Sequence, residues 1–559
     1  MDRREFLIAS MAALESENLS AGASQDQPRQ TNWDLVVYGA TAGGVMTAVA
    51  AARHGLKTVL LEPRRHVGGM STGGLSRTDV GKREVIGGLA LEFYYRVGER
   101  YEMRRFNHAV AWFYEPRVGE EIMREMLDEA GVTALFDHPL REGGGVVRKG
   151  STIEAVTAAN GARFAARMFA DCSYEGDLMA QAGVSYTWGR EGTDQYGESL
   201  AGIRERTPYH QFQVDVSPFD NGKLLPEIVQ EPRGKPGEAD RRVQAYNFRV
   251  IATNVYSKRV PWPKPASYDP HRYELLARLL KAMEEKLGRP QVFQEVTLIA
   301  LIPNGKADFN NQGAFSSDYI GKNYDYPEGS YARRAQIWQD HVDYQQGFYY
   351  FLANDKRVPR SLQEEVRSWG LCRDEFTDTG YWPHQLYVRE ARRMVGELVM
   401  TQRDLQTDRS KPDVIGMGSY NSDSHNVRRF VNERGFAENE GDMQVPVQPY
   451  QIPYRMMLPK PAEASNLLVP VCFSATHVAY SSLRMEPQYM ILGHAAGVAA
   501  ALALRDKVRP HDIDVKQLQQ ILLKEAAVFE YNEYQQQRSL QILRDRLRPS
   551  PPLRMNWEV

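Results

Sequence analysis

The stretch DLVVYGATAGG at residues 34–44 decides the fold. Its apolar half predicts a short strand, and its glycines stand where that strand gives way to an alanine-rich helix over residues 45–53, which ends at Gly55. A second apolar run, KTVLL at 57–61, predicts the next strand. Together these segments predict a βαβ unit and therefore an α/β fold.

The glycine turn of this unit has the features of a dinucleotide-binding loop. It fits the pattern GxGxxG except at Thr41, which stands in the middle glycine position. Free N–H groups and the dipole at the start of a helix stabilise a pyrophosphate, while Gly39 permits the tight turn and Gly44 close helix packing. Glu62, at the end of the second strand, is placed to bind ribose hydroxyls. At this point NAD(P) and FAD are both open as the cofactor.

The composition narrows the choice of partners. The chain has 559 residues, with 69 basic and 71 acidic side chains and a net charge of −2. This balance argues against a nucleic acid or an anionic membrane as the main partner. Cys172, Cys372 and Cys472 are far apart and have no histidine at ligand spacing, so we predict neither a disulfide framework nor a metal site.

The N-terminus has the layout of a twin-arginine export signal. Arg3 and Arg4 precede a short apolar run, and residues 21–23 (AGA) offer a cleavage site. Acidic residues interrupt the apolar run early, which leaves a cytoplasmic location as the alternative to export into the periplasm. Residues 1–30 are kept out of the fold prediction as a signal or disordered segment.

A second glycine-rich run, PRRHVGGMSTGG at 63–74, follows Glu62. A simple NAD dehydrogenase has no evident use for it. In two-part flavoproteins of the glutathione-reductase type, a similar segment wraps the pyrophosphate and leads the chain under the flavin ring. This resemblance favours FAD over NAD.

Further segments resemble the large bacterial family of FAD-dependent oxidoreductases, many of which are exported and some of which carry a xanthan-lyase-associated label. The matching segments are 36–44, 66–75, 86–90, 169–178, 386–394, 419–425 and 474–487. The resemblance implies an α/β, Rossmann-like FAD-binding domain of the glutathione-reductase type that is discontinuous, with an inserted α+β substrate domain. The implied boundaries are 31–199 and 454–506 for the FAD-binding domain, 200–453 for the substrate domain, and 507–559 for a C-terminal helix and tail.

The residues predicted to bind FAD come from the two glycine-rich runs and from the family segments. A helix that starts near Pro487 would aim its N-terminal dipole at the flavin N1 and C2=O, which become anionic on reduction. The predicted contacts are Gly39, Thr41, Ala42, Gly44, Glu62, Pro63, Arg64, Gly68, Gly69, Met70, Ser71, Asp171, Glu175, Arg484, Met485, Glu486 and Gly493.

No second GxGxxG pattern occurs between residues 200 and 453, so we predict no separate NAD(P)H domain. The flavin would then accept a hydride from a small organic substrate, such as a sugar or another polyhydroxylated compound, and pass electrons to oxygen or another acceptor. Two alternatives stay open: an NAD(P)-dependent dehydrogenase, and a flavin-binding protein without turnover.

Four residues are candidates for catalysis. His477 is the first candidate for the general base, because it lies between the late strand and the Pro487 helix, although it could equally be a packing histidine. His425 stands near Asp423 and could be an oriented imidazole. Tyr387 and Arg389 could bind an anionic or polyhydroxylated substrate, or belong to an ordinary cationic helix face.

One more histidine, His66, lies in the second glycine-rich run. In some relatives of this fold a histidine carries a covalent flavin link, so His66 is a candidate for that bond.

Overall fold

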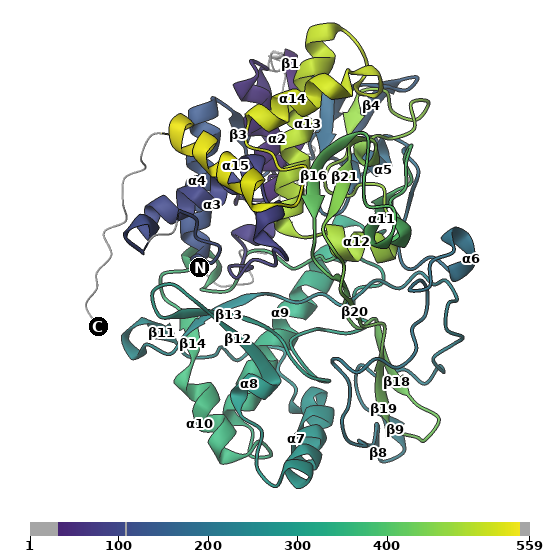
Figure 1. Ribbon diagram of the computed structural model, residues 1–559. Coiled ribbons are helices and arrows are strands. Elements are labelled where there is room, and N and C mark those ends of the chain that lie inside the picture. The colour runs from purple at the N-terminus through teal and green to yellow at the C-terminus, as the bar shows by residue number, and fades with distance from the viewer. Residues whose placement is uncertain (1–31, 107–108, 548–559) are drawn as a thin grey trace, which may run out of the picture. The chain divides into compact units, whose positions relative to one another are not determined.

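The computed structural model describes residues 32–106 and 109–547 (Figure 1). The predicted export signal lies outside these ranges, and export stays a prediction.

A parallel sheet forms where the βαβ unit is predicted. Strand β1 (Asn32–Tyr38) lies between β2 (Thr58–Leu61) and β6 (Arg163–Asp171), with β3 (Thr133–Leu135) beyond β2, and all four run parallel. Leu35, Val36 and Val37 are fully buried. This burial on both faces is typical of a parallel sheet covered by helices. The predicted α/β class is confirmed.

The sheet is completed by segments far apart in the chain. Strands β5 (Thr152–Thr157) and β4 (Val146–Lys149) extend it with antiparallel pairs. Strand β22 (Leu467–Leu468) pairs in parallel with the carboxyl end of β6. One sheet therefore contains residues from both ends of the described chain.

Helix α13 (Glu486–Asp506) packs on α2 (Ala42–Arg53) at backbone contact. A Cβ atom at Gly493 would clash with the carbonyl of Gly43, and one at Gly497 with the carbonyl of Thr47. By length and hydropathy α13 could span a membrane, but most of it is buried inside the protein. Helix α13 carries apolar residues on all its faces because the rest of the protein packs against all of them.

Other helices flank this sheet and close the chain: α3 (Gly88–Arg100), α4 (Pro116–Ala130), α14 (Val515–Lys524) and α15 (Glu533–Arg546). Helix α14 lies in the region predicted to hold a C-terminal helix, and a further helix, α15, follows it. Leu543 of α15 is buried in a cluster with Leu91 and Tyr95 of α3. The helical pattern there is weak, and tertiary packing supplies the stability that the local sequence lacks.

Residues between the two halves of the parallel sheet form a second, antiparallel sheet. Its order is β11-β14-β10-β13-β12, and it fills the lower part of Figure 1 together with α7 (Glu274–Leu287), α8 (Phe293–Val296), α9 (Tyr331–Asn354) and α10 (Arg360–Ser368). The strands are β10 (Val250–Thr253), β11 (Arg259–Val260), β12 (Thr297–Ile302), β13 (Lys306–Asn311) and β14 (Gly370–Cys372). The domain boundaries themselves stay predictions.

Short two-stranded ribbons also occur, and His425 follows one of their strands. They pair β7 (Tyr186–Thr187) with β15 (Arg393–Met394), β8 (Phe219–Asp220) with β9 (Lys223–Leu224), β16 (Val414–Gly418) with β21 (Tyr450–Pro453), β17 (Ser422–Ser424) with β20 (Met443–Val445), and β18 (Arg428–Val431) with β19 (Ala437–Glu440). The remaining short helices are α5 (Asp177–Gln181), α6 (Thr193–Tyr196), α11 (Gln402–Gln406) and α12 (His477–Leu483).

Candidate functional site

The first glycine-rich loop turns tightly between β1 and α2. Gly39 has φ +93°, and a Cβ there would lie 2.7 Å from the Ser173 nitrogen; a Cβ at Gly44 would clash with the Gly39 carbonyl. Thr41 is the N-cap of α2: its Oγ1 accepts from the Gly44 N–H at 3.2 Å and donates to the Cys172 carbonyl at 2.7 Å. The departure from the glycine pattern at Thr41 therefore provides a helix cap.

The start of α2 offers a free donor. The N–H of Val45 bonds to the Thr41 carbonyl, and that of Ala42 lies in the backbone bridge between Thr41 and Gly68, whereas within residues 32–106 and 109–547 the N–H of Gly43 has no acceptor. Such groups at a helix N-terminus are the donors that a pyrophosphate needs. The residues present therefore fit the phosphates of a dinucleotide.

Glu62 completes this end of the site. Its two carboxylate oxygens accept from the N–H groups of Ala40 at 2.7 Å and Arg64 at 2.9 Å. Burial nevertheless raises the pKa of Glu62 to about 7. The carboxyl group is thus fixed at the end of β2, in the position expected for binding ribose hydroxyls.

The second glycine-rich run meets the start of α13. Gly68 (φ +96°) and Gly69 (φ +54°) lead into a short 3₁₀ turn, Gly69–Ser71. The Tyr174 hydroxyl accepts from the Met70 N–H at 2.9 Å, and Tyr174 and Ser71 both donate to Glu486, at 2.7 and 3.1 Å. Burial raises the pKa of Glu486 to about 7. The structure thus brings together predicted residues from opposite ends of the chain.

Several other predicted cofactor contacts are engaged in protein contacts. The Asp171 carboxylate accepts from the N–H groups of Ser173 and Met179, which shapes the turn after β6. Glu175 accepts from the Tyr326 hydroxyl, and the Arg64 guanidinium lies 3.6 Å from the centre of the Trp338 ring. Met485, beside Arg484, is the N-cap of α13. Gly493 packs on Gly43. Pro63 is half-buried between Glu62 and Arg64. Their contacts to FAD stay predictions.

His477 lies in a closed network of buried charges. Its Nδ1 is 2.8 Å from Glu390 Oε2, and its backbone N–H donates to Glu191 at 2.9 Å. Arg393 pairs with both Glu191 and Glu390. Burial and the nearby Arg393 charge lower the pKa of His477 to about 3. The ring is therefore neutral near neutral pH.

His425 follows β17 and pairs with a residue that the sequence analysis missed. Its Nδ1 lies 2.7 Å from Asp318 Oδ2, while Asp423 Oδ1 is 3.9 Å from Nε2. Burial and Arg389 lower the pKa of His425 to about 4. Burial opposes ionisation of Asp318, but Arg389 and His425 outweigh it and lower its pKa to about 2. The ionised Asp318 accepts a hydrogen bond from the Nδ1–H group. In the neutral ring Nε2 then carries no proton and is an acceptor.

Three side chains surround the Asp318–His425 pair, which we call the dyad. They are Tyr387, Arg389 and Arg484. Arg484 donates to the Tyr387 hydroxyl at 3.1 Å and to the Asp423 carbonyl at 2.7 Å. Arg389 lies 3.0 Å from Asp318 and 4.7 Å from the centre of the Tyr387 ring. We call the residues around the Asp318–His425 pair the chamber; because Arg484 is two residues before Glu486, it adjoins the start of α13. The structure therefore brings His425, Tyr387 and Arg389 together. His477 lies in a neighbouring network that Gln244 joins to the chamber, since its amide accepts from the His425 N–H at 3.1 Å and donates to Glu390 at 2.9 Å.

The chamber holds buried polar atoms of both kinds that have no hydrogen-bond partner in the described part of the chain. The donors are Arg249 Nη1, Arg389 Nε and Arg484 Nε, and the acceptors are Asn247 Oδ1 and Asp442 Oδ2. Buried polar groups are nearly always hydrogen-bonded in native proteins. A mixed set of this kind suits a ligand that both donates and accepts.

Asp308 links the chamber to the second glycine-rich run. It pairs with Arg249 at 2.8 Å and accepts from the N–H groups of Ser76 at 3.1 Å and Arg77 at 3.0 Å. No sequence motif marks Asp308, Asp318 or Arg249, because each acts through a contact with a distant part of the chain.

His66 lies apart from this chamber. Its Nδ1 is 3.1 Å from Glu120 and its Nε2 is 3.0 Å from Asp378, and its ring stacks on that of His384 with centres 3.8 Å apart. Both ring nitrogens therefore face carboxylates, and a covalent flavin link at His66 stays a prediction.

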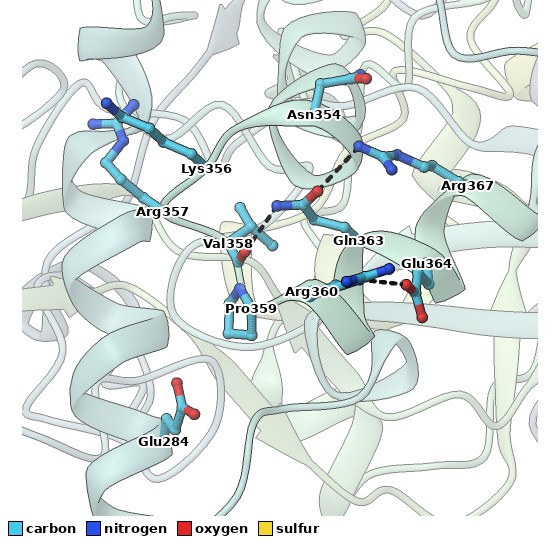
Figure 2. Close-up of a pocket in the computed structure, with 10 residues that line it drawn as sticks. All are labelled: Glu284, Asn354, Lys356, Arg357, Val358, Pro359, Arg360, Gln363, Glu364 and Arg367. Atoms are coloured by element: carbon cyan, nitrogen blue, oxygen red, sulfur yellow. Dashed lines mark hydrogen bonds and ion pairs between the residues drawn. The ribbon is translucent and has the colours of Figure 1, made fainter.

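A hollow of about 660 Å³ lies at the start of α10 (Figure 2). Its polar side chains pair locally: Arg360 with Glu364 at 2.8 Å, Arg367 with Gln363 at 3.0 Å, and Gln363 with the Val358 carbonyl at 2.9 Å. It contains none of the predicted site residues. A second cavity, of about 500 Å³, is lined in part by His210, whose ring lies parallel to that of His425.

The parallel sheet and the glycine-rich loop at the start of α2 are those of a dinucleotide-binding protein. Residues 34–522 match the family model described as FAD dependent oxidoreductase, and the chain belongs to that family. Its cofactor is accordingly FAD, which confirms the predicted resemblance and selects FAD over NAD(P). A comparison with curated proteins gives no significant match.

Solved structures with local similarity include three flavin or redox enzymes. The anhydrotetracycline hydroxylase OxyS from Streptomyces rimosus is 15% identical, over 32% of this chain and 42% of that one, with a TM-score of 0.21. Lactococcus lactis thioredoxin reductase is 17% identical, over 25% of this chain and 34% of that one, with a TM-score of 0.17. Proteus vulgaris L-amino acid deaminase is 16% identical, over 27% of this chain and 55% of that one, with a TM-score of 0.20. The chain spans less than two thirds of each of these proteins.

Proposed function

We propose that this FAD-dependent oxidoreductase oxidises a C–OH group of a small polyhydroxylated substrate in the chamber around His425. The observation that carries the proposal is the Asp318–His425 pair, 2.7 Å apart, with Arg389 and Arg484 beside it. His425 replaces His477 as our candidate for the general base, because the arginines beside His425, Arg389 and Arg484, hold nitrogen atoms that are unpartnered in the described chain. The arginine beside His477, Arg393, is paired with both Glu191 and Glu390.

Each residue of the chamber has its own role in such an oxidation. FAD, when bound, supplies a hydride acceptor. The His425 Nε2 atom takes the hydroxyl proton as the C–H hydride leaves, so the C–OH becomes a C=O group. Asp318 holds the ring in the required tautomer and stabilises the imidazolium that forms. Arg389 and Arg484 supply positive charge near the substrate oxygen.

Residues of both glycine-rich runs would hold FAD. We assign the N–H group of Gly43 to the pyrophosphate, Glu62 to the ribose, and the start of α13 with the 69–71 turn to the flavin end. This arrangement corresponds to the discontinuous glutathione-reductase type that the sequence predicts. The electron acceptor would be oxygen or another oxidant.

The choice of a polyhydroxylated substrate rests on the balance of the chamber. Two of the three arginines pair with a carboxylate, Arg249 with Asp308 and Arg389 with Asp318, so their positive charge is matched. Arg484 donates to the backbone carbonyl of Asp423. A simple anion would use only the donors. Hydroxyl groups donate and accept, and so can satisfy both kinds of unpartnered atom.

Anaerobic reduction of the bound flavin by a panel of sugars, polyols, amines and hydroxy acids tests the proposal. We expect sugars or polyols to bleach the flavin of the purified holoprotein, and the other classes to do so at least about tenfold more slowly. Bleaching by amines or acids alone would contradict the substrate class. No bleaching by any compound would favour a flavin-binding protein without turnover.

A further inference from the structure

The cavity of about 500 Å³ beside His210 is formed by segments of the region between the two halves of the parallel sheet. It lies between α7, α8, the loop after β13 and residue Gln444 of β20. Its volume is in the range of sites that hold drug-sized ligands. None of its lining residues belongs to the FAD-binding elements or to the dyad.

The cavity lining carries six glutamines together with an apolar helix face. The glutamines are Gln211, Gln213, Gln291, Gln294, Gln312 and Gln444. Helix α7 contributes Leu276, Leu279, Met283 and Leu287, spaced as one helical stripe, and Leu287 is 40% exposed. A glutamine amide both donates and accepts without carrying charge. The Gln211 amide is bound within the protein, whereas Gln291 Oε1 is buried without a partner in the described residues. This lining therefore matches a ligand that carries both hydroxyl groups and an apolar group.

Charge in the cavity is almost absent. Among the lining residues only Glu295 is acidic, and it pairs with Arg289 at 2.8 Å outside the cavity lining. Burial lowers the pKa of His210, which is therefore neutral at neutral pH. A charged ligand would find no free counter-charge here, so the lining favours a neutral compound.

His210 joins the cavity to the dyad. Its ring lies 6.3 Å from that of His425, centre to centre, with planes 16° apart. Its backbone has φ +47°, a conformation rare outside glycine, and the amide groups of Asn426 and Asn439 hold its carbonyl at 3.1 and 2.9 Å. Its Nδ1 is buried without a partner in the described residues. Strain of this kind is concentrated at functional sites.

We propose that this cavity is a second binding site for the substrate, which takes the apolar group of a neutral glycoside, with His210 at the junction to the oxidised sugar ring. The glutamines bind hydroxyl groups near the junction, and the α7 face packs against the aglycone. This inference rests on the proposed function for the position of the oxidised ring. It adds that the preferred substrate is a glycoside with an apolar substituent.

Binding of phenyl glycosides of glucose, galactose and mannose to the oxidised holoprotein, measured by calorimetry, tests the inference. We expect at least one phenyl glycoside to bind about tenfold more tightly than its free sugar, since burial of a phenyl group releases more than 1.4 kcal/mol of transfer free energy. The corresponding uronate should bind no better than the free sugar. Equal affinity of every glycoside and its free sugar, or no binding at all, would overturn the inference.

Two matched variants locate the binding. Met283→Trp fills the cavity from α7 and should weaken phenyl glycoside binding at least about tenfold. Leu301→Trp makes the same kind of change on β12, where Leu301 is 69% exposed, and should leave affinity unchanged. Gln291→Leu should cost about three- to tenfold, the loss of one hydrogen bond, with exposed Gln541→Leu as its control. Unchanged binding in Met283→Trp contradicts the site.

The two proposals can fail separately. Glycoside binding that depends on Met283 without any flavin reduction would support the cavity and contradict the oxidation. Flavin reduction by a free sugar with no effect of Met283→Trp on glycoside binding would support the oxidation and contradict the cavity.

Discussion

His477 is buried and His425 half-buried, and each has Nδ1 within 2.8 Å of a carboxylate oxygen. They differ in what surrounds the pair. Glu390, the partner of His477, is also bound by Arg393 and by the Gln244 amide at 2.9 Å. Around Asp318 and His425, by contrast, Arg389 Nε and Arg484 Nε lack partners in the described chain, and a cavity lies behind His210.

The contrast shows that a histidine beside a carboxylate does not by itself identify a general base. The same pair forms beside Arg393, which is paired with two carboxylates, and beside Arg389 and Arg484, which hold nitrogen atoms without a partner in the described residues. What separates them is whether the neighbouring donors and acceptors are already paired within the protein.

The largest effect should come from His425→Ala. Loss of the base should slow flavin reduction by about 10²- to 10⁴-fold while FAD stays bound, because His425 lies outside the glycine-rich loops. Rapid-mixing absorbance of the flavin measures the rate, and FAD content after purification is the control. Flavin reduction at the rate of the unmodified protein would contradict the assignment of His425 as the general base.

Asp318→Asn should have the next largest effect, a slowing of about tenfold or more, because the ring loses the charge that stabilises its imidazolium. Glu390→Gln makes the same change at His477 and should leave the reduction rate within about threefold. A larger slowing in Glu390→Gln than in Asp318→Asn would reverse the assignment of the two histidines.

His477→Ala should act on stability. Removal of a buried partner of Glu390 should lower the free energy of unfolding by about 1–3 kcal/mol, with flavin reduction nearly unchanged in the folded protein. Denaturant unfolding followed by fluorescence measures the first quantity. A 10²-fold slower flavin reduction at full FAD content would restore His477 as the base.

The smallest expected effect is the dependence of flavin reduction on pH. Because the pKa of His425 is lowered to about 4 in the folded protein, flavin reduction should be flat above about pH 5 and fall as the pH drops through about 4. The ordinary value is 6.5, so the contribution of His425 to the free energy of unfolding is present above pH 6.5 and is lost as the pH falls toward 4. A rate that declines already through pH 6.5 would contradict burial of a neutral ring.

The cofactor site was predictable because its geometry is local. Gly39, Thr41 and Gly44 lie within one turn, and a βαβ connection places Glu62 beside them whatever the rest of the chain does. The helix α13 was predictable from its apolar pattern and Pro487. Its contact with Ser71 through Glu486 was implied only by family resemblance, since no local rule joins residues that far apart.

The catalytic chamber was only partly predictable. His425, Tyr387 and Arg389 were found as candidates, and His477 was preferred because of its place in the chain order. Asp318 and His210 carry no motif. Their importance follows from contacts with His425, more than a hundred residues away along the chain, and from the conformation of His210 at φ +47°.

The sequence by itself therefore determined the βαβ unit, the dinucleotide loop and the family, because these depend on glycine conformation, apolar period and order of segments. Only the tertiary structure decided which histidine has an ionised partner and open neighbours. The physical reason is that pKa values and hydrogen-bond satisfaction depend on burial and on charges brought together by folding, and neither can be read from spacing along the chain.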